Sequence, residues 1–119
     1  MDHFELNNGV LCAEAVPLPL IAAEVGTPVY VYSRATLTRH ARVFRDALGI
    51  LRNAKIAFAV KSNPNLSVLK VLAAEGYGAD VVSGGEMERA LAAGMVPDGI
   101  VFSGVGKTGA EMRRGIEAG

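Results

Sequence analysis

Short apolar runs alternate with longer amphipathic stretches through the second half of the chain. Apolar runs bounded by turn residues are typical of buried strands, and apolar positions three and four apart are typical of helices. The pattern predicts three strand–helix pairs: strand 55–60 with helix 66–75, strand 79–82 with helix 84–93, and strand 99–102 with a helix from Gly109. Strands that alternate with helices of about ten residues indicate a parallel sheet.

The amino-terminal part has a different pattern. Asn7-Asn8-Gly9 separates two short strands within residues 4–12, as in a β-hairpin with an Asn-Gly turn. Residues 17–25 fit a short helix that begins with proline, and residues 28–32 fit a strand of β-branched and aromatic residues. Ser33 is placed to cap a further helix. An apolar stripe at helical spacing follows it and ends before Gly49: Leu37, Ala41, Phe44 and Leu48.

The length of 119 residues fits one small domain or part of a larger one. Three parallel strands leave two open edges, and a complete (βα)8 barrel needs roughly 250 residues. We therefore expect an α/β fold that is the first part of a TIM-like barrel, within a longer enzyme. The alternative is a small three-layer domain, which would be thinly stabilised at this size.

Composition excludes several classes of protein. Twelve basic and twelve acidic residues balance, which argues against a nucleic-acid or acidic-membrane surface. A single cysteine, Cys12, excludes an internal disulfide and a cysteine metal cluster, and His3 and His40 lack ligand spacing. Residues 1–9 resemble no secretion signal, and no apolar run approaches a membrane span, so we expect a cytoplasmic protein without a metal site.

Lys61 is the first candidate for chemistry, because it follows the apolar run of strand 55–60 and precedes Ser62-Asn63-Pro64-Asn65. The carboxyl ends of parallel strands are where barrel and doubly wound enzymes place their chemistry. A lysine amine there can form a Schiff base if it loses its proton easily, which burial favours. The alternative is a solvated lysine at a strand end, which is the commoner case.

Asp80 is the second candidate, because it interrupts an otherwise apolar strand. A buried carboxylate is costly unless it is paired or hydrogen-bonded. Side chains alternate along strands, so Lys61 shares a face with Ala57 and Ala59, and Asp80 shares one with Val82. If those faces coincide, Lys61 and Asp80 meet in one cavity. The alternative is an acid at a frayed strand end that faces water.

Two glycine-containing turns are weaker candidates. Ser83-Gly84-Gly85-Glu86 lets a ligand approach the backbone or simply turns the chain, and Ser83 with Glu86 fits a capping box, as Thr108 does with Glu111. Gly104 to Gly109 matches G-x-G-x-x-G, but no acid follows about twenty residues later. The same stretch lacks the first glycine of a P-loop. A turn with a helix cap is the better interpretation.

Four segments in matching order resemble one enzyme family: Gly26–Ser33, Phe58–Asn63, Gly78–Glu86 and Ile100–Thr108. They are similar to the opening strand, the cofactor-lysine motif and the next two barrel strands of diaminopimelate decarboxylases. These are pyridoxal-phosphate enzymes of the fold-type III, alanine-racemase-like barrel group. The segment from Asn8 to Leu20 also looks typical of the bacterial enzymes.

The resemblance implies that Lys61 holds pyridoxal 5'-phosphate covalently and that Asp80 lies near that cofactor. It implies decarboxylation of meso-diaminopimelate to L-lysine, in a homodimer with shared active sites. It also implies a division into an amino-terminal hairpin and helix segment, residues 1–27, and a partial cofactor-binding barrel, residues 28–119, with the first strand in a second, β domain. The family's phosphate loop and substrate-binding groups would lie beyond Gly119, so we expect the 119-residue chain alone to be inactive.

Two alternatives remain from the residues. Another member of the same cofactor class, a decarboxylase of ornithine, arginine or carboxynorspermidine or a racemase, would share the lysine. A non-catalytic βα module that binds a phosphorylated ligand or a partner would not need Lys61 for chemistry.

Overall fold

Asn8 and Gly9 both have positive φ, 49° and 80°, as a two-residue type I′ turn requires. In a computed structural model, which describes residues 2–119, this turn joins β1 (Phe4–Asn7) to β2 (Val10–Ala13) as an antiparallel hairpin. The predicted hairpin is therefore confirmed. A short β3 (Val16–Pro17), which the sequence pattern did not predict, pairs with β2. The predicted helix follows as α1 (Leu18–Val25).

The strand predicted at residues 28–32 is wrong. This segment has no strand partner among residues 2–119, and the Tyr30 side chain is 90% exposed. β-branched and aromatic residues favour extended backbone, but a strand also needs a neighbour for its backbone N–H and C=O groups. Nothing in the described chain supplies that neighbour.

The helix predicted after Ser33 is α2 (Arg34–Ala47), and the Ser33 hydroxyl accepts a hydrogen bond from the amide of Thr36. The carboxylate of Glu14 also lies at this helix end, where its Oε1 accepts from the Ser33 hydroxyl at 2.8 Å and from the Ala35 amide at 2.9 Å. Orphan amides at a helix start favour a carboxylate. Glu14 therefore ties the hairpin to α2.

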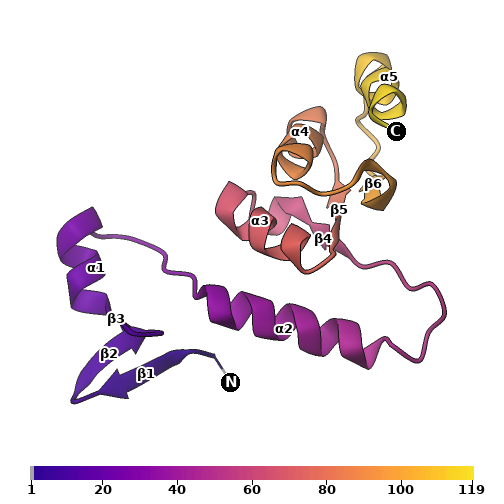
Figure 1. The fold of residues 1–119 in the computed structure, drawn as a ribbon. Coiled ribbons are helices and arrows are strands. Elements are labelled where there is room, and N and C mark those ends of the chain that lie inside the picture. The colour runs from indigo at the N-terminus through magenta and orange to yellow at the C-terminus, as the bar shows by residue number, and fades with distance from the viewer. Residues whose placement is uncertain (1) are drawn as a thin grey trace.

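The second half forms a parallel sheet in the order β4-β5-β6, with a helix after each strand. The strands are β4 (Ala57–Ala59), β5 (Gly78–Val81) and β6 (Ile100–Phe102), and the helices are α3 (Leu66–Ala74), α4 (Gly84–Ala92) and α5 (Gly109–Ala118). The predicted α/β alternation is confirmed, and Figure 1 shows the units in chain order. β4 is shorter than the predicted strand 55–60, because it begins at Ala57 and a 3-10 helix, η1 (Val60–Ser62), takes its last residue.

The helices cover one face of this sheet only. Ala79 and Val81 of β5 are fully buried there and belong to one core with Leu69 of α3 and Met87 of α4. Burying a side chain of this kind is worth roughly 1.5–3 kcal/mol. The opposite face carries alternate residues that pair across the strands: Ala59, Asp80 and Val101. No helix covers this face among residues 2–119, and Val101 is 56% exposed.

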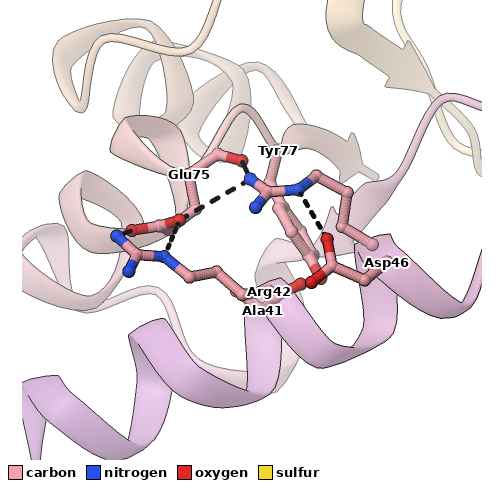
Figure 2. A network of polar contacts seen from close by, with 6 residues as sticks. Ala41, Arg42, Asp46, Glu75 and Tyr77 are labelled. Atoms are coloured by element: carbon pink, nitrogen blue, oxygen red, sulfur yellow. Dashed lines mark hydrogen bonds and ion pairs between the residues drawn. The ribbon is translucent and has the colours of Figure 1, made fainter. Parts of the chain in front are cut away.

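A polar network joins α2 to the turn between α3 and β5 (Figure 2). The Tyr77 hydroxyl donates to the carbonyl of Ala41 at 2.9 Å, in a buried position. The guanidinium of Arg42 donates to both carboxylate oxygens of Glu75, at 2.8 and 2.9 Å, and its hydrogen bonds hold the pKa of Glu75 below its ordinary value. Arg45 donates to the Glu75 carbonyl at 3.1 Å. The network fixes the helix before the sheet against the sheet's first βα unit.

The chain is less compact than a closed domain of its length. Its radius of gyration is 17.1 Å, against about 13.5 Å expected for a compact domain of this length. A groove of about 360 Å³ lies where α4, β6 and α5 meet, lined by apolar side chains that include Met87, Phe102 and Met112. Within residues 2–119, the helices are all too short or too polar to span a bilayer.

Candidate functional site

Lys61 lies in η1, one residue past the buried Val60, rather than in the strand itself. The turn is held by its neighbours: the Ser62 hydroxyl donates to the carbonyl of Ala59 at 2.7 Å, and the Asn63 amide donates to that of Val60 at 3.1 Å. The Lys61 side chain is exposed.

The two asparagines that follow explain why the chain turns where it does. The Asn63 side chain accepts from the Asn65 amide at 3.1 Å, and the Asn65 side chain accepts from the Ser67 amide at 2.9 Å, which caps α3. Short polar side chains make such local bonds readily. Lys61 is therefore held between β4 and the start of α3.

The other lysines of the sheet region have partners. Lys55 pairs with the carboxylate of Asp98 at 2.8 Å. The Lys107 amine donates to the carbonyls of Ser103 and Gly104, at 3.0 and 2.6 Å, and lies 5.3 Å from the centre of the Phe102 ring. No hydrogen bond or ion pair within residues 2–119 engages the Lys61 amine. Its amine is available to a ligand.

Asp80 lies inside β5, in register with Ala59 of β4 and Val101 of β6. It is half-buried, and its Oδ1 accepts a hydrogen bond of 2.6 Å from the hydroxyl of Ser103. The alternative of an acid at a frayed strand end is therefore wrong. Asp80 and Ala59 share the uncovered face, as alternation predicts for two strands in parallel register.

Lys61 and Asp80 come from the same end of the sheet but do not touch. Neighbouring strands lie about 4.8 Å apart, so Ala59 lies directly beside Asp80, and Lys61 follows Ala59 by two residues. No hydrogen bond or ion pair joins them within the described chain. The two residues come from neighbouring strand ends, Lys61 just after β4 and Asp80 one residue before the end of β5.

The turn at Ser83-Gly84-Gly85-Glu86 serves helix capping. The Ser83 hydroxyl accepts from the Glu86 amide at 3.3 Å, but the Glu86 carboxylate accepts from the Val82 amide rather than from that of Ser83. The predicted capping box is thus only half formed. The Gly84 amide donates to Oε1 of Glu111 at 2.8 Å, so this amide is already occupied.

Glu111 joins the starts of two helices. Its second carboxylate oxygen accepts from the amide and hydroxyl of Thr108, both at 2.9 Å, so the capping box predicted there is confirmed. Hydrogen bonds from Thr108 and then from Gly84 lower the pKa of Glu111. The G-x-G-x-x-G stretch is therefore a turn with a helix cap. Glu111 holds α4 and α5 side by side at the end of the sheet that carries Lys61 and Asp80.

The sequence reasoning missed Ser103 and the bond between Glu111 and Gly84. Ser103 is the first residue after β6, at the same sheet end as Lys61 and Asp80. A search for polar residues at the carboxyl ends of all three predicted strands would have included it. The Glu111 contact joins residues 27 positions apart, for which the local pattern holds no signal.

Comparisons with known proteins bear on this arrangement. Residues 34–119 match the family model described as the pyridoxal binding domain of pyridoxal-dependent decarboxylases. Among curated proteins, the chain is 56% identical over its whole length to the diaminopimelate decarboxylases of Zymomonas mobilis and Pseudomonas fluorescens, where it covers 29% and 28% of those proteins.

Solved structures agree with the sequence matches. A protein of Aquifex aeolicus matches with a TM-score of 0.89 at 40% identity. The diaminopimelate decarboxylase of M. jannaschii in complex with L-lysine matches with a TM-score of 0.85 at 33% identity. Each match covers 98% of this chain and 28% of the other. The chain thus spans somewhat more than a quarter of the length of its relatives, and its sheet is the first part of their α/β fold.

Proposed function

Because the chain belongs to the pyridoxal-dependent decarboxylase family, we propose that Lys61 is the residue that binds pyridoxal 5'-phosphate covalently. One observation carries the proposal: of the lysines near the sheet ends, Lys61 alone lies at a carboxyl end with an amine that residues 2–119 leave unpartnered. Lys55 and Lys107 are engaged by other groups.

The residues around Lys61 fit a flat aromatic cofactor. The uncovered face beside it carries the small residues Ala57 and Ala59, whose side chains project little above the strand. Asp80 supplies a carboxylate on that face, with Oδ1 bonded to Ser103 and no hydrogen bond to Oδ2 among residues 2–119. Lys61 and Asp80 thus place an amine and a carboxylate at the same end of the sheet.

We propose that the full-length protein decarboxylates meso-diaminopimelate to L-lysine. The support is the 56% identity to named diaminopimelate decarboxylases over the whole chain. Bound pyridoxal phosphate supplies an electron sink for the charge left when carbon dioxide departs. In this scheme the Lys61 amine would hold the cofactor, and the same amine, when free, would move a proton at the reacting carbon. We expect the 119-residue chain alone not to turn over substrate.

Three further parts of the proposal concern the whole protein. Residues 28–119 contribute to a cofactor-binding barrel, and residues 1–27 begin a second domain. The full-length protein is a homodimer of the cytoplasm and acts on a free amino acid. A sedimentation measurement on the full-length protein tests the dimer, and a monomer that retains full activity would contradict it.

Borohydride trapping tests the cofactor lysine. The full-length protein is loaded with pyridoxal phosphate, reduced, digested and mapped for the pyridoxyl group. We expect the label on Lys61, and loss of the cofactor absorbance band and of activity in Lys61→Ala. Lys70→Ala is the matched control, because Lys70 is also exposed but lies on α3. A non-catalytic binding module would keep its ligand in Lys61→Ala, and a label elsewhere would refute the assignment.

A further inference from the structure

The strongest polar contact on the uncovered face joins Ser103 to Asp80. The serine hydroxyl donates to Oδ1 at 2.6 Å, within the range of a hydroxyl bound to an ionised carboxylate. Among residues 2–119, the other acceptor within reach of the hydroxyl is the Val81 carbonyl at 3.5 Å, which is too far to compete. The bond therefore runs to the carboxylate.

The backbone fixes the serine in place. The Ser103 amide donates to the carbonyl of Val81 at 2.9 Å, which extends the β5–β6 ladder one residue past β6. The Ser103 carbonyl is held in turn by the Lys107 amine at 3.0 Å. These two backbone bonds hold the Ser103 main chain at the position from which its hydroxyl reaches Asp80.

The bond determines which oxygen of Asp80 remains available. Oδ1 is occupied by Ser103, whereas Oδ2 has no hydrogen-bond partner among residues 2–119. A carboxylate on a strand rotates about a soft terminal torsion unless one oxygen is held. Holding Oδ1 leaves Oδ2 in one orientation on the face that Asp80 shares with Ala59.

We propose that Ser103 is a positioning residue, which orients the Asp80 carboxylate toward the pyridoxal phosphate on Lys61. The inference rests on the proposed cofactor site and adds a residue to it. Ser103 need not touch the cofactor, because it acts through Asp80. A carboxylate with one oxygen held would present the other in a fixed direction to a polar group of the bound cofactor.

The test uses the full-length protein and compares Ser103→Ala with Ser103→Thr, which keeps a hydroxyl. Two readouts are independent of turnover: the dissociation constant of pyridoxal phosphate from the apoenzyme, and the circular dichroism of the bound cofactor's absorbance band, which reports its orientation. We expect Ser103→Ala to weaken cofactor binding about tenfold and to change the dichroism, and Ser103→Thr to restore both. kcat should fall more than KM changes.

Two controls separate positioning from general damage. Ser67→Ala removes an exposed hydroxyl that makes no hydrogen bond among residues 2–119, and it should leave every readout unchanged. In an Asp80→Asn background, Ser103→Ala should add little further loss, because the serine acts through the carboxylate.

Three results would each overturn the inference. The first is a Ser103→Ala variant with the cofactor binding and dichroism of the wild type, and the second is a Ser103→Thr variant as impaired as Ser103→Ala. The third is a double variant in which the losses from Asp80→Asn and Ser103→Ala add. The proposed function is tested separately by borohydride trapping. If the reduced wild-type protein carries no label on Lys61, that result refutes the cofactor assignment, whatever the Ser103 variants show.

Discussion

Gly78 is the position where a single methyl group should do most harm to the sheet. A Cβ built there lies 1.9 Å from the carbonyl oxygen of Gly99 and 2.7 Å from its carbon. The clash is with backbone, so no side chain can move aside. To reach even 3.0 Å, the shortest separation that real Cβ atoms show, β5 and the segment before β6 must part by about 1.1 Å.

That displacement has a cost that can be worked from the contacts. The Gly78 amide donates to the Ile56 carbonyl at 2.8 Å, and the next residue, Ala79, pairs with Ile100. Weakening one or two backbone hydrogen bonds costs about 1 kcal/mol each, and overpacking adds about 1–3 kcal/mol. We expect Gly78→Ala to lower the free energy of unfolding by about 2–5 kcal/mol.

Urea unfolding of the full-length protein, followed by circular dichroism in the far ultraviolet, measures the change. Gly106→Ala is the control, because a Cβ at Gly106 meets nothing within 4 Å and its φ is not positive. We expect the control to remain within about 0.5 kcal/mol of the wild type. Because Asp80 lies two residues beyond Gly78, Gly78→Ala should also weaken cofactor binding. Equal unfolding midpoints for the two variants would refute the reasoning.

Two further predictions concern polar contacts between elements. Tyr77→Phe removes the buried hydrogen bond to the Ala41 carbonyl and should cost about 1–2 kcal/mol by the same urea assay; an unchanged midpoint would show that water replaces the hydroxyl. Glu111→Gln should lower stability at neutral pH and flatten its pH dependence. The folded-state pKa of Glu111 lies below its ordinary value of 4.5, so its contribution is present above that pH and is lost as the pH falls through the lower value. A free energy of unfolding that falls more steeply with decreasing pH in Glu111→Gln than in the wild type would contradict this.

The local pattern was enough to predict the elements whose causes are local. The Asn8-Gly9 turn and the Ser33 cap follow from one or two residues that favour that backbone, and both are in the structure. The strand at residues 28–32 failed because a strand depends on a neighbour that no local pattern specifies. The end of β4 at Ala59, in contrast, has a local cause. The Ser62 hydroxyl donates to the Ala59 carbonyl and favours a 3-10 turn over extended backbone.

The site shows the same division. Lys61 and Asp80 could be chosen from the sequence, because each breaks an apolar run and each strand position fixes a face. Parallel register then brought Asp80 beside Ala59, as alternation requires. The partner of Asp80 could not be chosen in this way, because Ser103 is 23 residues away and is an ordinary residue of a turn. Only the pairing of β5 with β6 gives that serine its acceptor.

The open face bears on the electrostatics of the proposed site at Lys61 and Asp80. Val101 and Ala57 are exposed beside Asp80, so water reaches this face within the described chain. In water a carboxylate and an ammonium interact by only about 1 kcal/mol at 4 Å, and the interaction strengthens several-fold where water is excluded. The arrangement of Lys61, Asp80 and Ser103 is therefore set within residues 2–119, whereas the electrostatic strength that catalysis needs depends on whatever covers this face. A full-length protein in which this face stayed open to water would bind the cofactor weakly, however well Ser103 orients Asp80.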